Sequence, residues 1–316
     1  QRGAWDMDER LLVEHWAEME AGLSRMAEFL ANEGIYDRQR LPTNAVLAVI
    51  ASLFPSIPTA GDKQGQDKLL LKKYMWYAFF TDRYENAAPT HAFADYIALK
   101  RVIKGERKED GSVYTEKDVP IFASHKLAEK EELLTVEWPK QASIRGRAIL
   151  AVSCCMGALD FSTGDKLSVS NVNNRHYHHL FPDALLKEAG IESSLALNCA
   201  LISDTTNVSI GRKEPLRYLT DRYKWATPEI VRERLESHLV PIPELANGGY
   251  EGLTDDEKKK KLSLDFEKFI QRRAELVVKA VQLLVAGHQL SPAMLFKEGV
   301  VAQSGLIDRM MGNLHK

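Results

Sequence analysis

The chain has 316 residues, of which 45% are apolar and 27% are charged. Its 42 Lys and Arg residues against 44 Asp and Glu residues give a formal net charge of -2. This composition is typical of a soluble globular protein and excludes a disulfide-stapled mini-protein. It shows no overall basic field, although a neutral protein can still carry a local cationic groove for nucleic acid.

The three cysteines, Cys154, Cys155 and Cys199, include an adjacent pair and no C-x-x-C spacing. They predict neither a disulfide framework nor a thiolate zinc site, so the expected compartment is the reducing cytoplasm. The chain starts at Gln1, and its first ten residues resemble neither a signal peptide nor a transit peptide. We therefore expect a fragment of a longer protein.

Membrane insertion is not expected. The longest apolar runs, such as residues 148–152 and 283–286, are far shorter than the roughly 20 residues that a membrane span needs. No membrane partner is predicted.

The first third of the chain predicts helices. From residue 8 to 33, apolar residues recur mostly at three- and four-residue steps, which indicates a long amphipathic helix that packs on its neighbours. Further helices are expected over residues 43–54, 66–84 and 90–103. The aromatic stretch 74–80 is expected in the core, and the four helices predict a small bundle.

The middle of the chain changes character. Residues 104–118 are rich in charge and predict a solvated loop, and a helix is expected over residues 142–159. Short apolar runs then predict two strands, over residues 167–170 and 200–203, on either side of a helix over residues 182–190.

The last part is predicted to be helical again, over residues 215–222, 228–239 and 258–284. The predicted fold class is therefore mainly α, a helical bundle that carries one small mixed module. The expected domains are a helical region over 1–141, the module over 142–225, and a C-terminal helical region over 226–316 that packs back on the module.

A cluster of histidines and asparagines carries the chemistry. His178 and His179 precede Leu-Phe-Pro at the start of a predicted helix, and Asn198 and Asn207 follow downstream. Hydrolysis of a phosphodiester needs a base for water, a cation that neutralises charge on the phosphate and leaving oxygen, and a frame that holds both. These residue types supply each part.

Residues 160–218 resemble the HNH endonucleases, the His-Me finger or ββα-metal class, whose signature is Asp-His-Ile-x-Pro, then Asn, then a metal-binding Asn or His. The resemblance gives His179 the general-base position and His178 the preceding metal-ligand position, where the family usually has Asp. It gives Asn207 the second metal-ligand position. Asn198 takes the asparagine that orders the loop and is counted with the catalytic residues. The implied cofactor is Mg²⁺, with Mn²⁺ as the alternative.

Other residues near the motif have weaker assignments. Candidates for phosphate contacts that position DNA without reading its sequence are Arg175, Arg212, Lys213 and Arg217. Asp204 is an alternative to Asn207 as a metal ligand, because it too precedes the expected helix. His176 is interpreted as a surface strand residue without a role.

The resemblance extends beyond the motif. Residues 74–84 with Asp95, and the helix over residues 266–274, resemble parts of GmrSD-type restriction enzymes and SspE-type phage-defence nucleases. In that family an N-terminal nucleotide-hydrolysing domain precedes this part, and its Asp-Gly-Gln-Arg type motif does not occur here. The resemblance covers most of residues 66–286 and implies that the chain is the effector half.

The predicted function is a metal-dependent DNA endonuclease or nickase, the effector of a phage-defence or type IV-like restriction system that cuts phage or modified DNA. Two alternatives stay open. A degenerate finger would make the chain a DNA- or protein-binding module. A metal-dependent RNase is the other alternative, because the same site attacks any phosphodiester and the sequence contains no recognisable reader of the 2′-hydroxyl.

Overall fold

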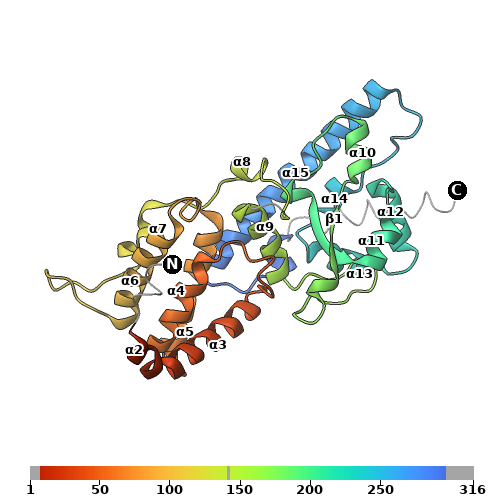
Figure 1. Ribbon diagram of the computed structural model, residues 1–316. Helices are drawn as coiled ribbons and strands as arrows, with labels where there is room; N and C mark the ends of the chain where they lie inside the picture. Colours follow the sequence, from red (N-terminus) through yellow and green to blue (C-terminus); the bar gives the residue numbers. More distant parts are fainter. Residues whose placement is uncertain (1–7, 141–142, 297–316) are drawn as a thin grey trace. The chain divides into compact units, whose positions relative to one another are not determined.

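The computed structural model describes residues 8–140 and 143–296. Its described part is mainly helical with one two-stranded antiparallel sheet, which confirms the predicted class at that level (Figure 1). The chain divides into two compact units, residues 1–32 with 43–127 and residues 33–42 with 128–316. The predicted boundary at residues 141/142 and the end of the predicted C-terminal region lie outside the described residues. The three-region division stays a prediction.

The described helices of the first unit follow the predicted order. They are α2 (Glu9–Glu14), α3 (Trp16–Asn32), α4 (Ala45–Leu53), η1 (Phe54–Ser56), α5 (Asp62–Phe80), α6 (Ala88–Lys104), η2 (Glu116–Asp118) and α7 (Pro120–Ser124). The predicted helix over residues 8–33 is interrupted at His15, so it forms α2 and α3. The aromatic stretch of α5 lies in the core as predicted, since Tyr74, Trp76 and Phe79 are fully buried.

Helix α3 packs on α4 from Gly22 toward its C-terminus. A Cβ atom on Gly22 would lie 2.5 Å from the carbonyl oxygen of Ala51, so this close approach requires glycine. Phe29 and Leu30 are buried beside this contact region, whereas Val13 and Trp16 are 79% and 63% exposed. The prediction that the whole apolar side packs on neighbouring helices is therefore wrong for the N-terminal half.

The second unit contains the sheet. Its elements are α8 (Lys130–Leu133), α9 (Ile144–Cys155), η3 (Val172–Asn174), β1 (Arg175–His179), α10 (Asp183–Glu188), η4 (Ala196–Asn198), β2 (Cys199–Ser203), α11 (Asp204–Ile210), α12 (Pro215–Tyr223), α13 (Pro228–Glu236), α14 (Ile242–Leu245), α15 (Asp255–Val285) and α16 (Pro292–Leu295). Strands β1 and β2 are antiparallel, with Arg175 opposite Ser203 and His179 opposite Cys199.

The first predicted strand is in the wrong place. Residues 167–170 form a turn, in which the side chain of Asn171 accepts a hydrogen bond from the backbone N–H of Ser168 at 3.0 Å. Such local side-chain bonds compete with strand pairing. The strand instead begins at Arg175 and carries all three clustered histidines, whereas the second predicted strand is confirmed as β2.

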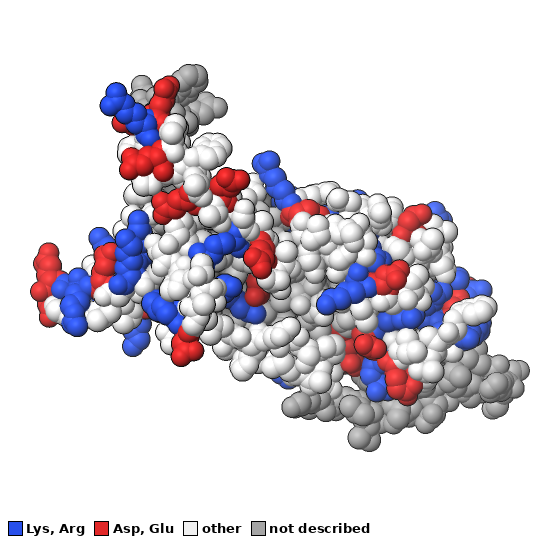
Figure 2. Space-filling model, turned by 90° about the horizontal axis from the view of Figure 1, so that it is seen from below, with Lys and Arg blue, Asp and Glu red and all other residues white. Residues whose placement is uncertain are grey.

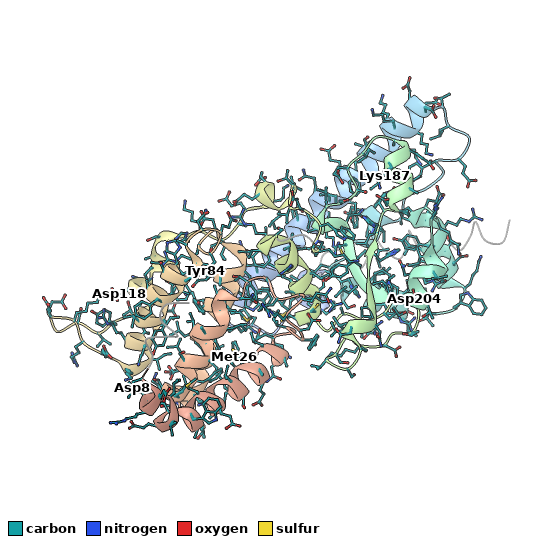
Figure 3. The ribbon with its side chains drawn as sticks, viewed as in Figure 1. Asp8, Met26, Tyr84, Asp118, Lys187 and Asp204 are labelled. Carbon is teal, nitrogen blue, oxygen red and sulfur yellow. The ribbon has the colours of Figure 1, made fainter. Side chains whose placement is uncertain are left out.

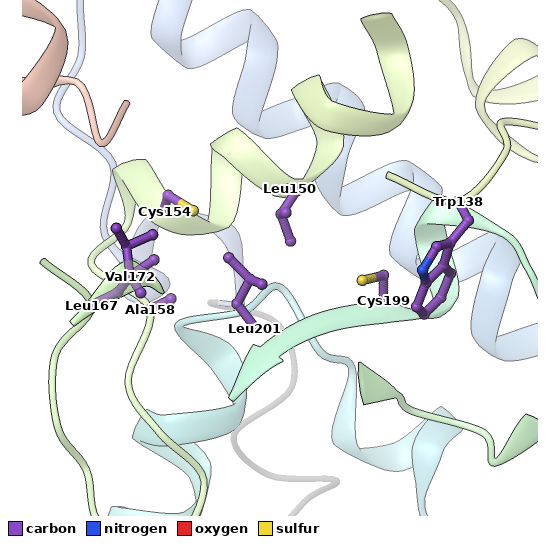
Figure 4. Close-up of a cluster of buried hydrophobic side chains, with 8 residues drawn as sticks. All are labelled: Trp138, Leu150, Cys154, Ala158, Leu167, Val172, Cys199 and Leu201. Carbon is purple, nitrogen blue, oxygen red and sulfur yellow. The ribbon is translucent and has the colours of Figure 1, made fainter. Parts of the chain in front are cut away.

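A hydrophobic cluster lies between β2 and α9 (Figure 4). Its buried members are Trp138, Leu150, Cys154, Ala158, Leu167, Val172, Cys199 and Leu201. Helix α15 covers another side of the same unit, because the ring of Phe181 lies 5.3 Å from that of Phe266 and 5.2 Å from that of Phe269. Among the described helices, none combines the length and the apolar character that a bilayer crossing requires.

Candidate active site

Strand β1 presents its histidines to two different environments. Successive side chains of a strand point to opposite faces, so the side chains of His178 and His179 leave β1 on opposite sides, although both reach the wall of one pocket at the end of the strand. His178 faces α11, the helix that follows β2 directly, and meets Asn207 there. Tyr177 and His179 face the hydrophobic cluster, where His179 meets Trp138.

His178 and Asn207 are in direct contact. The Nδ1 atom of His178 lies 2.9 Å from Oδ1 of Asn207. The His178 side chain is only 4% exposed, and this burial lowers its pKa to about 4, against a smaller opposing effect of the Asn207 hydrogen bond. His178 is therefore neutral near pH 7, with a lone pair on one ring nitrogen.

This pair fits a divalent cation. In this contact Nδ1 donates its proton to the Asn207 oxygen, so a cation would take the place of that proton. With the ring proton moved to Nε2, the two atoms, 2.9 Å apart, could each lie about 2.1 Å from one metal ion. Nε2 of His178 is buried without a hydrogen-bond partner. The amide oxygen of Asn207 suits Mg²⁺ and Mn²⁺, whereas the imidazole of His178 is a softer ligand that suits transition-metal ions better than Mg²⁺. No three His, Cys, Asp or Glu side chains in the described part of the chain form a metal-binding group.

His179 lies beside this pair and is half-buried. Burial lowers its pKa, and the nearby carboxylate of Asp183 opposes part of that shift. Its Nε2 atom is buried without a hydrogen-bond partner. A neutral imidazole with a free nitrogen is the form that accepts a proton.

Asn198 acts on the loop that leads from β1 to β2. It is fully buried, accepts a hydrogen bond from the N–H of Phe181 at 2.8 Å, and donates to the carbonyls of Phe181 and Ser193, each at 3.1 Å. These three bonds agree with the loop-ordering position that the motif gives it. Asn198 does not line the pocket and is a positioning residue.

An open pocket of about 330 Å³ unites the motif residues. Its lining consists of Tyr177, His178, His179, Pro182, Asp183, Ala184, Asn207, Gly211 and Arg212. Residues that are 29 positions apart in the sequence thus share one site. Asp204, the alternative ligand, does not line this pocket; it begins α11 (Figure 3), and its carboxylate lies 3.5 Å from Nε2 of His176.

The four predicted phosphate contacts differ in their surroundings. Arg212 lines the pocket, is exposed, and has no ion-pair partner among the described residues. Lys213 donates to Asp221 at 2.8 Å, and Arg217 lies 3.8 Å from the Glu251 carboxylate. Over the face seen in Figure 2, Lys and Arg side chains are interspersed with Asp and Glu, so no continuous basic field appears there.

Arg175 does not suit the predicted phosphate contact. It is 8% exposed, and its guanidinium donates to the Asp160 carboxylate and to the Asp165 carbonyl, both at 3.1 Å. An ion pair of this kind is costly to break because each charge would be left buried alone. Arg175 is therefore held inside the protein and is not available for a phosphate contact.

Asp160 connects the elements of the site, although no motif in the sequence points to it. Its buried carboxylate accepts hydrogen bonds from the N–H of Ser203 at 2.6 Å, the hydroxyl of Thr206 at 2.5 Å and the guanidinium of Arg175. Burial alone would raise its pKa, but hydrogen bonds from Thr163, Thr206 and Ser203 hold the pKa well below the usual range. One carboxylate thus joins β1 to the junction between β2 and α11.

Comparisons with protein-family models, with curated proteins and with solved structures returned no match. The family resemblance of the motif therefore stays a prediction. What stands independently of it is the pocket, with His178, Asn207 and His179 in its wall.

Proposed function

We propose that this chain is a divalent-metal-dependent DNA endonuclease or nickase of the HNH class, which acts in the cytoplasm as the effector part of a restriction or phage-defence system. The observation that carries the proposal is the contact between His178 and Asn207 in the same pocket as His179. The order β1, β2, α11 supports it, since the first strand supplies the histidines and the helix supplies the asparagine.

His179 is the general base in this proposal. Burial favours its neutral form, so the ring can take a proton from a water molecule that attacks phosphorus at neutral pH. A group with this role contributes to the transition state and little to the binding of substrate. The neighbouring Asp183 carboxylate favours the protonated ring that results from the transfer.

His178 and Asn207 are the residues that hold the cation. A bound divalent cation stabilises the charge that grows on the phosphate and on the departing 3′ oxygen. Two neutral protein ligands leave coordination positions for water and for the substrate phosphate. The neutral state of His178 near pH 7 keeps its lone pair available.

Arg212 is the best placed phosphate contact. It lines the pocket, whereas Lys213 is paired with Asp221 and Arg217 lies outside the pocket wall. A guanidinium suits a phosphate because its donors form a planar fork. Such a contact positions the backbone of a nucleic acid without reading its sequence.

The test is a plasmid-nicking assay of the wild-type chain, His179→Ala and Asn207→Ala with Mg²⁺, Mn²⁺ or EDTA, with a structured RNA in parallel. His179→Ala is expected to lower the rate by roughly 10²–10⁴-fold without loss of fold or DNA binding, because it removes only a proton-transfer group. Asn207→Ala is expected to raise the metal concentration needed for half-maximal cleavage. His176→Ala is the matched control, since His176 is exposed on the same strand and does not line the pocket.

Each alternative has its own result. Cleavage of RNA but not of the plasmid would replace DNA by RNA as the substrate. A gel shift without cleavage under any metal condition would favour the binding module. Equal nicking by the wild type and His179→Ala would refute the general-base assignment.

A further inference from the structure

The imidazole of His179 lies flat against the indole of Trp138. The two ring centroids are 4.0 Å apart and the ring planes differ by 14°. This is the only ring contact of His179 within residues 8–140 and 143–296, and neither of its ring nitrogens has a hydrogen-bond partner there. The orientation of this ring is therefore set by stacking and not by a hydrogen-bond acceptor.

Trp138 is itself held firmly. The carbonyl of Val136 accepts a hydrogen bond from Ala196 at 2.9 Å, and Glu137 forms an isolated antiparallel bridge with Leu195. On the other side, a Cβ atom on Gly146 of α9 would lie 2.6 Å from the carbonyl oxygen of Glu137, so α9 packs closely on this backbone. The segment that carries the indole is thus fixed between α9 and the turn before β2.

The indole also belongs to the hydrophobic cluster. It is 9% exposed and lies close to Cys199 at the start of β2, the residue opposite His179 in the sheet register (Figure 4). The indole of Trp138 therefore contacts the hydrophobic cluster, and the imidazole of His179 stacks on the same indole. A rigid aromatic surface thus forms one wall behind the ring of His179.

We propose that Trp138 is a positioning residue for His179: its indole fixes the plane of the imidazole in the wall of the pocket. The proposal rests on the proposed function, in which His179 is the base. Rotation of a histidine ring about its last side-chain bond is soft and has broad minima, so a ring without a hydrogen bond needs another restraint. An offset or parallel aromatic contact supplies one. Proton transfer depends strongly on this orientation, since small misplacements of a reacting group are costly.

The test compares Trp138→Phe, Trp138→Leu, His179→Ala and Leu167→Ala in the full chain, with supercoiled plasmid as the substrate. Leu167→Ala is the matched control, because Leu167 is buried in the same cluster and its aliphatic side chain cannot stack on an imidazole. Trp138→Leu is expected to lower kcat by roughly 10–100-fold with KM unchanged. Trp138→Phe, which keeps an aromatic face, is expected to restore most of the rate, and Leu167→Ala to keep it.

A spectroscopic measurement reports on the stack itself. In histidine-labelled protein, the ring current of Trp138 shifts the imidazole proton signals of His179 upfield. Those signals are expected to stay upfield in Trp138→Phe and in Leu167→Ala, and to move toward the positions of a free imidazole in Trp138→Leu. His179→Ala identifies the signals by their loss.

Three results would overturn the positioning role. The first is a kcat for Trp138→Leu equal to that of Leu167→Ala, and the second is an effect on KM alone, which would indicate a substrate contact. The third is a His179 signal that does not depend on Trp138. If the wild type itself does not cleave, the proposed function fails and the positioning role fails with it, whereas normal wild-type cleavage with an unaffected Trp138→Leu refutes the positioning role alone.

Discussion

Two buried polar regions of the molecule differ in how completely their hydrogen bonds are satisfied. In the first unit, the fully buried Asp95 carboxylate accepts from Arg83 twice at 3.0 Å, from the Tyr84 hydroxyl at 2.6 Å and from the Ile121 N–H at 3.2 Å. In the second unit, the pocket histidines His178 and His179 each leave Nε2 buried without a partner. The first arrangement is complete in itself, and the second has capacity left for a ligand.

The two regions are expected to contribute differently, the first to stability and the second to function. A satisfied buried cluster is costly to disturb, since any missing member leaves another group buried and unpaired. A buried nitrogen without a hydrogen-bond partner already destabilises the folded state. Replacing that histidine ring therefore removes an unfavourable contribution to the free energy of folding. The comparison therefore predicts a large stability effect at Asp95 and a large activity effect at His179.

The largest stability effect is expected for Asp95→Ala. It leaves the Arg83 guanidinium buried without its carboxylate, which typically costs about 3–5 kcal/mol. Urea denaturation, followed by tryptophan fluorescence and circular dichroism, measures the change. Glu106→Ala is the control, because the Glu106 carboxylate forms a solvent-exposed pair with Arg101 at 3.9 Å and its loss is expected to change the midpoint little. A small change in the urea midpoint of Asp95→Ala would show that the fully hydrogen-bonded cluster around Asp95 contributes little to the stability of the fold.

A smaller effect is expected for Asn198→Ala, which removes the three bonds that order the loop between β1 and β2. The Phe181 N–H and two carbonyls lose their partner, which costs about 2 kcal/mol. Hydrogen exchange at the Phe181 amide is expected to accelerate. The Leu180 amide is the internal control, because it donates to the backbone carbonyl of residue 198 at 2.9 Å. Unchanged protection of Phe181 would contradict the loop-ordering role.

The smallest effect, counted per pH unit, is a dependence of stability on pH through His238, whose ring is fully buried and donates its Nε2–H to the Leu159 carbonyl at 2.8 Å. Burial lowers its pKa to about 4, against the opposing effect of that hydrogen bond. The unfolded chain, with a pKa near 6.5, therefore binds the proton more readily between pH 6.5 and 4. Folding stability falls as pH falls through this window, by up to about 1.4 kcal/mol per pH unit for one such histidine.

Thermal unfolding between pH 7.5 and 5 measures this slope. His238→Gln keeps an amide near the position of Nε2 and is expected to make the slope shallower. His176→Gln, an exposed position on β1, is the control and is expected to leave the slope unchanged. Equal slopes in the wild type and His238→Gln would rule out His238 as the titrating group.

The sequence predicted correctly those helices that depend on the spacing of residues close together in the chain. Helical periodicity predicted α5 and α15 because their apolar faces repeat at helical spacing, and the spacing of the motif brought His178, His179 and Asn207 to one pocket. The turn at residues 167–170 misled the prediction because alternation of Leu, Ser, Val and Ser also fits local side-chain bonds to the backbone.

The residues of the site whose roles the sequence did not predict depend on contacts with partners that are distant in the sequence. The charge of Arg175 is visible in the sequence, but its burial depends on Asp160, in a turn fifteen residues earlier. Trp138 has no local pattern at all, because its place follows from the pairing of Glu137 with Leu195. In both cases tertiary contacts decide the role, and residue type alone does not.

The carboxylate of Asp160 has a consequence for how a ligand is selected. Because it binds Arg175 of β1, Ser203 at the end of β2 and Thr206 of α11, the strand and the helix that form the pocket cannot shift independently. Their conformational freedom is already lost in the folded chain, so a ligand pays little to order them. If the ligand is a nucleic acid, as in the proposed function, the nucleic acid would have to adapt its own shape instead. Its selection would then depend on how easily each stretch bends or unstacks, even where no side chain reads its bases.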